Sequence, residues 1–533
     1  MPVSRRQFIH KVGAAGGYAA AYAAMQALGL LAPASAFAAG APPDLAKGGG
    51  GGGARVVILG AGVAGMSAAW ELGKAGYDCT VLEARGRTGG RNWTVRKGDV
   101  IAMTDGSRQV SEHDEGQYFN AGPARLPSHH QIVLGYCREL GVELEVEVNS
   151  SRSAMILNPA ANGGKPIQMR RAINDTRGHV SELLAKAINT GALDQALTGQ
   201  DKQRMVAFLK TYGDLSPDLF YKGSQRAGLK TEPGAGDEKG SAYDPLDMSL
   251  LLDENLWNGV LFEEVIDMQA TMFQPKGGMD RIPAAFAKAL GPKVIRRRCE
   301  VKKIRKRPGG GVAITYRDQA AGKDVVLEAD YCLSTIPLPV LARIDADFSP
   351  AYAQAIARTP YRDSIKIAWQ APRFWEGPRY QIYGGLSFVN GPTSLVWYPS
   401  YGLHSKTGVI LGAYAGGPAA DALAKLPRGE QIELTRKVID QLHPGGGQLL
   451  EKPLQVEWAK IPYSLGIGAG WASEDEPDYH LLGRPDGPIH FAGEYLSHVG
   501  AWQEGAIRAA HRAIVMLDAQ HRKGQPVTAV RAI

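Results

Sequence analysis

The residues whose types and spacing most clearly predict chemistry are three glycines and one carboxylate. Gly60, Gly62 and Gly65 form the pattern GxGxxG directly after an apolar β-branched run at residues 56–59. Glycines there permit a tight turn, let the backbone approach a pyrophosphate, and let the following helix pack close to the strand. The helix N-terminus offers free N–H groups to phosphates. The next apolar run ends at Glu83, which is placed to accept hydrogen bonds from a ribose. Together these features favour a bound dinucleotide over an ordinary strand–turn–helix connection.

A segment rich in glycine and arginine follows at once. It reads Ala84-Arg85-Gly86-Arg87-Thr88-Gly89-Gly90-Arg91. The combined pattern GxGxxG…EARxRxGGR resembles the flavin amine oxidase family, which includes monoamine, polyamine and L-amino-acid oxidases. The resemblance implies that the dinucleotide is FAD, that Arg91 neutralises its phosphate charge, and that Gly89 and Gly90 let the backbone pass close to it. An arginine fork suits phosphate better than lysine does.

The resemblance continues in the middle and at the end of the chain. It implies that the Val301 backbone meets the adenine end, and that Glu494 meets the ribityl or pyrophosphate part, with Gly493 allowing close approach. Trp458 and Tyr463 are expected beside the flavin, although either could be plain core. No cysteine or histidine is placed like a covalent attachment site, so we expect non-covalent FAD. The complete set expected to contact FAD is Gly60, Gly62, Ala64, Gly65, Glu83, Ala84, Arg85, Gly89, Gly90, Arg91, Gly122, Pro123, Ala124, Arg125, Val301, Trp458, Tyr463, Gly493, Glu494, Ala501 and Trp502.

One arginine decides the branch within this family. The run Asn120 to Pro127 reads NAGPARLP and resembles the GPMRLP-type segment of L-amino-acid oxidases, where the matching arginine pairs with the substrate α-carboxylate. Bidentate recognition of a carboxylate is the chemistry that guanidinium suits best. A substrate without a carboxylate would leave a buried arginine unpaired, which is costly. We therefore expect Arg125 to bind carboxylate; the alternative is a structural ion pair.

Two further side chains are expected beside the substrate. Tyr414, in a strand pattern, would give a second carboxylate contact, although a tyrosine in a strand is often core with a satisfied hydroxyl. Lys366 resembles the family lysine that holds a water at flavin N5, where a positive charge favours reduced, anionic flavin. A lysine among apolar neighbours is costly without partners. The alternative is an edge-strand lysine that reaches solvent.

Aromatic residues near the C-terminus are expected to wall the substrate pocket. Ala501 and Trp502 match a Gly-Trp pair whose backbone holds the substrate amino group and whose indole forms a wall. Alanine stands where venom-type enzymes have glycine, which puts the closeness of that backbone contact in doubt. Trp471 is expected on the same side of the flavin, or as core.

These residues predict oxidative deamination of an L-amino acid to a 2-oxo acid, with hydride transfer from the α-carbon to flavin N5. Dioxygen is the second substrate, and ammonia and hydrogen peroxide are released. We find no metal cluster and no nucleophile triad, and nominate no general base. The alternatives are an amine or polyamine oxidase of the same fold, an amino-acid 2-monooxygenase, and a secreted flavoprotein without catalysis. Side-chain preference stays open: Asp214, Asp218 or Glu263 could select a cationic side chain, although acids in such segments are usually solvated.

The fold class expected is α/β, with a discontinuous Rossmann-like FAD-binding domain, a mixed-sheet substrate domain and a helical insertion. Amphipathic patterns predict helices at 129–140, 180–188, 202–212 and 246–256 within the insertion. The expected divisions are a signal peptide (1–38), a Gly-rich linker (39–54), FAD-binding parts (55–127, 256–344 and 481–533), the helical insertion (128–255) and the substrate domain (345–480).

The N-terminus resembles a twin-arginine export signal, with Arg5-Arg6 before an uncharged Ala-rich stretch that ends in Ala36-Phe37-Ala38. We expect cleavage and a periplasmic or secreted protein with no stable membrane anchor; the alternative is a transmembrane segment. The net charge of +7 over 533 residues is too mild to indicate nucleic-acid binding. Disulfide pairing among the four cysteines stays open, and a homo-oligomer, guessed as a dimer, is implied only by resemblance.

Overall fold

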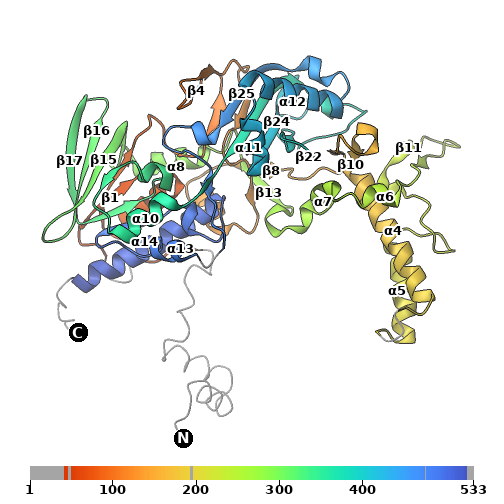
Figure 1. The fold of residues 1–533 in the computed structure, drawn as a ribbon, viewed down its shortest axis with the longest axis horizontal. Helices are drawn as coiled ribbons and strands as arrows, with labels where there is room; N and C mark the ends of the chain where they lie inside the picture. Colours follow the sequence, from red (N-terminus) through yellow and green to blue (C-terminus); the bar gives the residue numbers. More distant parts are fainter. Residues whose placement is uncertain (1–40, 46–49, 193–195, 474–475, 525–533) are drawn as a thin grey trace, which may run out of the picture.

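The computed structural model of the protein describes residues 41–45, 50–192, 196–473 and 476–524 (Figure 1). The expected signal peptide lies outside these residues, as does part of the Gly-rich linker. Among the helices described, none combines the length and apolar character needed to cross a bilayer.

A five-stranded parallel sheet gathers the beginning, middle and end of the chain. In spatial order its strands are β14 (Ile295–Arg297), β2 (Asp78–Glu83), β1 (Arg55–Leu59), β18 (Tyr331–Ser334) and β27 (Ile489–Phe491). The central strand β1 is the apolar run seen in the sequence. Because side chains alternate along a strand, its Val56 and Ile58 enter one core while Val57 and Leu59 enter another.

These two cores have different covers (Figure 1). The first holds α2 (Val63–Lys74), α3 (Gln131–Glu139), α8 (Arg281–Leu290) and α14 (Gln503–Gly524). The second holds a four-stranded sheet of β17 (Lys323–Ala329), β16 (Val312–Asp318), β15 (Cys299–Lys306) and β19 (Asp345–Ala346), with the helices α9 (Leu338–Leu341), α10 (Pro350–Arg358) and α13 (Pro477–Leu482). The parallel sheet is therefore covered on both faces, as its continuous apolar strands require.

A seven-stranded mixed sheet forms the second large layer. Its order is β10 (Ile167–Gln168), β9 (Met155–Leu157), β22 (Leu386–Val389), β23 (Leu395–Trp397), β24 (Thr407–Gly416), β21 (Ser364–Pro372) and β25 (Glu451–Glu457). The helices α11 (Pro418–Ala424) and α12 (Arg428–Leu442) pack on it. The expected α/β class is confirmed. The strands β9 and β10 lie in the segment expected to be helical, because the short apolar run 154–157 pairs with the distant β22.

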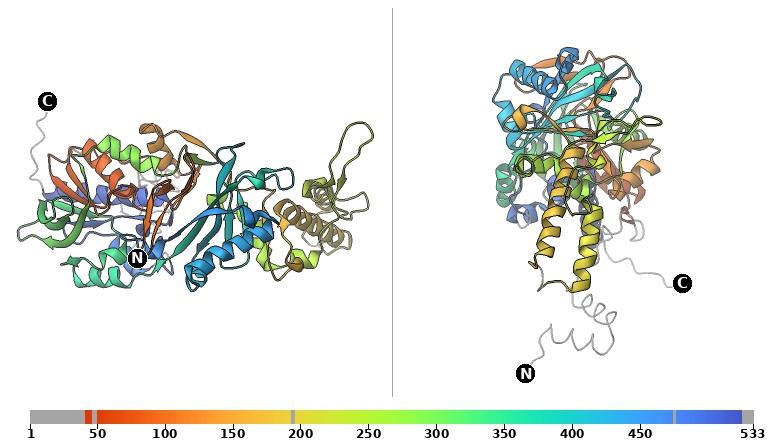
Figure 2. Two further views of the ribbon diagram at one scale, coloured as in Figure 1. Left: turned by 90° about the horizontal axis from the view of Figure 1, so that it is seen from above. Right: turned by 90° about the vertical axis from the view of Figure 1, so that its right-hand side faces the viewer.

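A helical arm leaves the body beyond these strands. It is built on α4 (Met169–Asn189) and α5 (Gly199–Tyr212), which pack side by side (Figure 2, right). Ile188, Leu209 and Tyr221 belong to a small core of its own. The helix expected at 246–256 is broken into α6 (Met248–Leu251) and α7 (Glu254–Val260). The Asp253 carboxylate accepts the backbone N–H of Asn255, which starts a new helix there.

Short strands join the two large sheets. They are β3 (Thr94–Arg96) with β6 (Tyr118–Asn120), and β8 (Leu144–Glu147) and β7 (Leu126–Pro127) on either side of β13 (Met272–Pro275). Peripheral pairs are β4 (Val100–Ala102) with β5 (Arg108–Val110), β11 (Leu229–Thr231) with β12 (Ser241–Ala242), and β20 (Tyr361–Arg362) with β26 (Gly468–Ala469).

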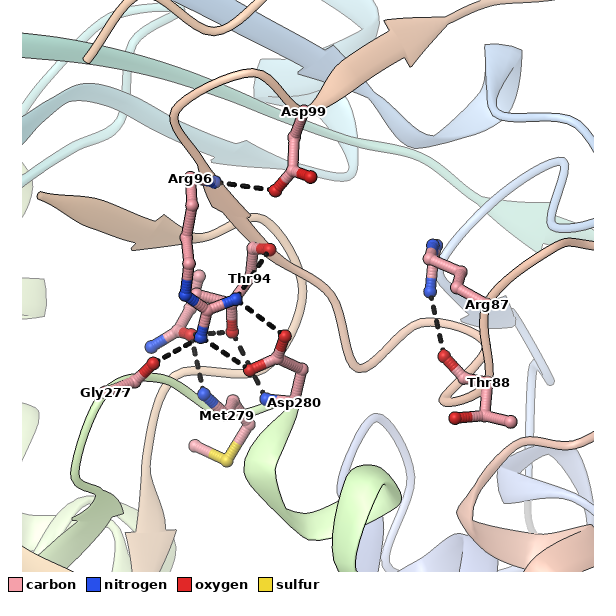
Figure 3. A network of polar contacts seen from close by, with 9 residues as sticks. Arg87, Thr88, Thr94, Arg96, Asp99, Gly277, Met279 and Asp280 are labelled. Atoms are coloured by element: carbon pink, nitrogen blue, oxygen red, sulfur yellow. Dashed lines mark hydrogen bonds and ion pairs between the residues drawn. The ribbon is translucent and has the colours of Figure 1, made fainter. Parts of the chain in front are cut away.

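A polar network fixes β3 to the start of α8 (Figure 3). The Arg96 guanidinium forms two 2.8 Å contacts with Asp280 and also donates to the carbonyl of Gly277. The Thr94 hydroxyl donates to the Asn120 side-chain oxygen at 2.8 Å and accepts the backbone N–H of Asp280 at 3.2 Å. Asn120, at the end of β6, is therefore held in place just before the segment that carries Arg125.

Candidate functional site

A cavity of about 550 Å³ reaches from the carboxyl ends of β1, β2 and β18 to the strands β21 and β24. Ligands of open parallel sheets bind at this edge, and the volume lies within the usual range of ligand pockets. The predicted residues that line it are Gly60, Gly62, Ala64, Glu83, Ala84, Arg85, Gly89, Gly90, Arg91, Gly122, Pro123, Val301, Lys366, Tyr414, Trp458, Tyr463, Gly493, Glu494, Ala501 and Trp502. Gly65, Ala124, Arg125 and Trp471 were also expected at the site and do not line the cavity.

The glycine-rich turn leaves the N-terminus of α2 open toward the cavity. No side chain caps this helix, no acidic residue lies in its first turn, and Val63 and Ala64 line the cavity. The first N–H groups of a helix have no partner within it and attract anions. Gly65 does not line the cavity but shapes the turn that does. A Cβ at Gly65 would lie 2.1 Å from the Gly60 carbonyl oxygen, so only glycine allows this close packing of helix and turn.

Glu83 supports the turn as well as facing the cavity. Its carboxylate accepts the backbone N–H groups of Ala61 and Arg85, both at 2.9 Å. The residue is buried at the end of β2, and it lines the cavity beside the glycines. The arrangement suits an acid that holds the turn and meets a ribose.

Arg91 and Glu494 form an ion pair with an Nη1–Oε1 distance of 3.0 Å, in which Glu494 is buried and Arg91 is partly buried. The two residues lie 403 positions apart, so the pair ties the first part of the chain to the last. A Cβ on Gly122 would lie 1.8 Å from the Arg91 carbonyl oxygen, which shows how closely these backbones pass. An uncapped helix terminus, a turn-holding acid and a partly buried arginine in one long cavity fit FAD.

Lys366 faces the cavity from the interior strand β21, which pairs with β24 on one side and β25 on the other. This placement excludes the alternative of an edge-strand lysine that reaches solvent. The Nζ donates to the carbonyls of Asn120 at 2.9 Å and Gly122 at 2.6 Å. Burial, assisted by the nearby charge of Arg125, lowers the pKa of Lys366 to about 7. The amine can therefore hold or release a proton near neutral pH.

Arg125 stands one aromatic layer behind the cavity. Its guanidinium carbon lies 4.8 Å from the ring centre of Trp397, 5.8 Å from Phe262 and 5.9 Å from Trp502. The residue is 7% exposed, and Nη1 donates to the side-chain oxygen of Asn149. Within the described part of the chain, no carboxylate lies within 4 Å of it and its other N–H groups have no hydrogen-bond partner. The expected alternative of a structural ion pair is not what the described residues form.

Trp397 connects this arginine to the cavity and was missed by the sequence analysis. Its ring lies 5.7 Å from that of Tyr414 and 5.6 Å from Nζ of Lys366, and it also contacts Arg125. Tyr414 itself lines the cavity, with Lys366 Nζ 4.7 Å from its ring. An aromatic residue in a short strand resembles ordinary core, so no local signal marked Trp397.

A buried carboxylate, Glu147, lies near the same arginine and was also missed. It closes β8 and, with Ala124 and Trp397, lines a second cavity of about 50 Å³. Neither of its oxygens has a hydrogen bond of normal geometry from the described residues. Burial raises the pKa of Glu147 to about 7, although the charge of Arg125 opposes the rise.

The three acids considered for side-chain selection lie elsewhere. The Asp214 carboxylate accepts the Ser224 hydroxyl at 2.6 Å, Asp218 pairs with Lys222 at 3.2 Å, and Glu263 pairs with Arg152 at 2.9 Å. None of the three lines either cavity.

Trp471 also departs from its expected place. Its indole N–H donates to the Tyr495 carbonyl at 2.8 Å, and its ring packs edge-on against Tyr479, which matches the alternative reading as core. The four cysteines are buried and unpaired.

Several other lining residues missed by the sequence analysis follow β18. They include Thr335, Pro337 and Arg343. The rule that ligands bind beyond the carboxyl ends of parallel strands could have marked the residues after this strand.

Comparisons with known proteins agree with this geometry. The model of the family described as flavin containing amine oxidoreductase matches residues 63–513. An L-amino-acid oxidase of Siganus canaliculatus is 28% identical over 87% of this chain and 85% of its own length. A putative L-amino-acid oxidase of Bacillus subtilis is 26% identical over 86% and 93%, and an L-amino-acid oxidase of Pseudechis australis is 28% identical over 85% of each protein.

Solved structures share the fold at lower identity. Cyclohexylamine oxidase from Brevibacterium oxydans matches with a TM-score of 0.59 and 16% identity, over 88% of this chain and 99% of that one. Putrescine oxidase bound to putrescine matches with a TM-score of 0.56 and 20% identity, over 87% and 99%. With the family model covering most of the sequence, the resemblance seen in the motifs is confirmed: the chain belongs to the flavin-containing amine oxidoreductases.

Proposed function

We propose that the protein is an L-amino-acid oxidase that converts an L-amino acid, dioxygen and water to a 2-oxo acid, ammonia and hydrogen peroxide. The observation that carries the proposal is the state of Arg125. A buried guanidinium with one amide partner and no carboxylate within 4 Å among the described residues is poised for an anionic ligand. The names of the relatives that match most of the chain support the same activity.

The surroundings of Arg125 also say how a carboxylate would reach it. The arginine lies behind Trp397 and Trp502, and Trp502 lines the cavity. The substrate carboxylate would enter between the two indoles, leaving the α-carbon on the cavity side. Tyr414 lies beside Trp397 and would donate its hydroxyl to the same carboxylate.

The charges that line the cavity argue against a diamine or polyamine substrate. Three carboxylates occur among the lining residues described, and each has a partner. Glu83 accepts two backbone N–H groups, Glu494 pairs with Arg91, and Glu300 pairs with Lys302 at 2.8 Å. No lining acid is therefore free to hold a second ammonium group.

The protein side chains supply position and electrostatics for the reaction. Bound non-covalently in the long cavity, flavin would supply hydride acceptance from the α-carbon and electron transfer to dioxygen. Arg125 and Tyr414 would fix the carboxylate, and Trp502 and Trp458 would exclude water around the α-carbon. Lys366 would hold a proton at Nζ beside the carbonyls of the segment 120–122. The imino acid product would hydrolyse in water.

The test is a panel of L-amino acids, their D-enantiomers, and the amines that decarboxylation of each would give. Peroxide formation with L-amino acids, and little with the amines, supports the proposal. A preference for the amines would identify an amine oxidase. An amide product without free peroxide would identify a monooxygenase, and a flavin that no substrate bleaches without oxygen would identify a non-catalytic flavoprotein.

Export and assembly are separate proposals. We propose that the twin-arginine sequence at Arg5-Arg6 directs the folded protein out of the cytoplasm, which suits a protein that must bind its cofactor before transport. Cell fractionation of the full chain, with Arg5 and Arg6 both changed to lysine as a control, tests this. We also propose a homodimer, which light scattering of the purified protein tests.

A further inference from the structure

Three side chains of metal-ligand type meet close to the residues that surround Arg125. They are His129 and His130, just before α3, and Asp267 in the short helix η6 (Ile266–Met268). The Asp267 Oδ1 lies 2.8 Å from Nε2 of His129 and 3.3 Å from Nε2 of His130. The sequence shows no metal-type spacing because the aspartate lies 138 positions from His129.

The buried histidine gives an independent indication of a ligand. His130 is 2% exposed, and its Nε2 lies 3.3 Å from the shared carboxylate oxygen without a hydrogen bond of normal geometry from the described residues. Its neighbour His129 is 40% exposed on its side chain, so an ion from solvent can reach the cluster. A buried imidazole nitrogen without a hydrogen bond is costly, and a metal ion would satisfy it.

We propose that His129, His130 and Asp267 bind a divalent ion of the Zn²⁺ class, with water completing the coordination. Two imidazoles and one carboxylate are a ligand set that Zn²⁺ accepts and Ca²⁺ does not prefer. All three ligand atoms lie within 4.8 Å of one another. Tetrahedral Zn²⁺ separates its ligands by about 3.3 Å, so the exposed His129 needs only a small movement to close the set.

The cluster lies next to two groups that contact Arg125, namely Asn149 and Trp502. The carbonyl of Met268 in η6 accepts the Asn149 side-chain amide at 2.8 Å, and Asn149 in turn accepts from Arg125. On the other side, the His130 ring lies 5.0 Å from that of Trp502. A bound ion would therefore tether η6 to the start of α3 and stiffen both supports of the arginine.

The experiment is calorimetric titration of the untagged holoprotein with Zn²⁺ alone and with Ca²⁺ alone. We expect one Zn²⁺ site per chain, with affinity at least about tenfold weaker in His129→Ala and in Asp267→Asn, and no comparable Ca²⁺ binding. Matched controls are His480→Ala and Glu264→Gln, which change an exposed histidine and an exposed acid outside the cluster and should keep the wild-type affinity.

A second measurement tests whether the ion holds η6 against the start of α3. Hydrogen exchange of residues 262–268 should slow when Zn²⁺ is added to the wild-type protein and stay unchanged in His129→Ala. Equal Zn²⁺ affinity in the wild type and both cluster variants would overturn the proposal, as would Ca²⁺ binding as tight as Zn²⁺ binding. Because both readouts measure the ion rather than turnover, they stand whether or not the protein oxidises amino acids.

Discussion

Replacing Arg125 by methionine keeps an unbranched apolar stem and removes the guanidinium with its charge. In the wild-type protein the guanidinium is 7% exposed and gives only one N–H to a protein acceptor among the described residues, which leaves donors for a bidentate contact with substrate. Removing one partner from a buried, hydrogen-bonded charge pair costs about 2–5 kcal/mol. At 1.36 kcal/mol for each factor of ten, kcat/KM for L-amino acids should fall by about 30- to 5,000-fold.

The same change should leave a substrate without a carboxylate nearly unaffected. The decisive quantity is therefore the ratio of kcat/KM for an L-amino acid to that for the amine made by its decarboxylation, measured through peroxide formation. In Arg125→Met this ratio should fall by about 30- to 5,000-fold. The visible flavin spectrum should show that the variant retains its cofactor.

Arg436→Met is the matched control for this experiment. Arg436 also lies over an indole, with its guanidinium carbon 4.5 Å from the ring centre of Trp369, but it belongs to α12 and does not line the cavity. Its substitution should leave the ratio at the wild-type value. If Arg125→Met also leaves the ratio unchanged, the carboxylate is bound elsewhere and the reasoning is refuted.

Three further changes test other parts of the site. Because the pKa of Lys366 is lowered from 10.5 to about 7, the unfolded state binds more protons than the folded state between these pH values. The free energy of unfolding of the apoprotein, measured with urea, should therefore increase from about pH 7 to 9, and Lys366→Met should reduce this increase. The same dependence on pH in both proteins would contradict the lowered pKa. Because the pKa of Glu147 is raised to about 7, its carboxylate is charged above that pH and competes with the substrate carboxylate for Arg125. KM for amino acids should therefore increase from about pH 6 to 8, and Glu147→Gln should remove most of this increase. Identical pH profiles of KM in the two proteins would exclude Glu147 from this role. A Cβ at Gly65 would lie 2.1 Å from a backbone oxygen of the glycine-rich turn, so Gly65→Ala should weaken FAD binding by at least about tenfold, measured by flavin release. Gly73→Ala is the control, because Gly73 lies in the same helix with open space around it. Equal retention of FAD in both variants would contradict the close-packing argument.

The sequence predicted well where a function depends on neighbours in the chain. The glycines at 60, 62 and 65 act through a turn and a helix that follow them directly, so their spacing alone indicated the strand, the turn and the side of the sheet that holds a ligand. The fold class and the family were confirmed for the same reason. Most residues carried over from family motifs line one cavity, although they come from segments hundreds of positions apart.

The features that were missed depend on contacts between distant segments. Arg125 has neighbours on β23 and in η5 (Phe262–Glu264), and no local pattern places Trp397 or Phe262 against it. Glu147 looks like one more acid in an alternating strand, and only the packing of β8 buries it. The prediction of one helix at 246–256 was wrong because Asp253 caps the start of α7 with its side chain, which outweighs the continuous apolar pattern.

The interleaved parallel sheet has a consequence for how the chain is made. Its outer strand β27 and the long helix α14 are the last described elements to leave the ribosome, yet β27 pairs with β18 and α14 packs on α2. Until they emerge, β18 presents an unpaired edge and the apolar side of α2 stays uncovered, a state that favours aggregation. The parallel sheet and its helical cover are therefore completed only once residues 489–524 have been made, and a chain cut before β27 would lack both its outer strand and the helix that packs on α2.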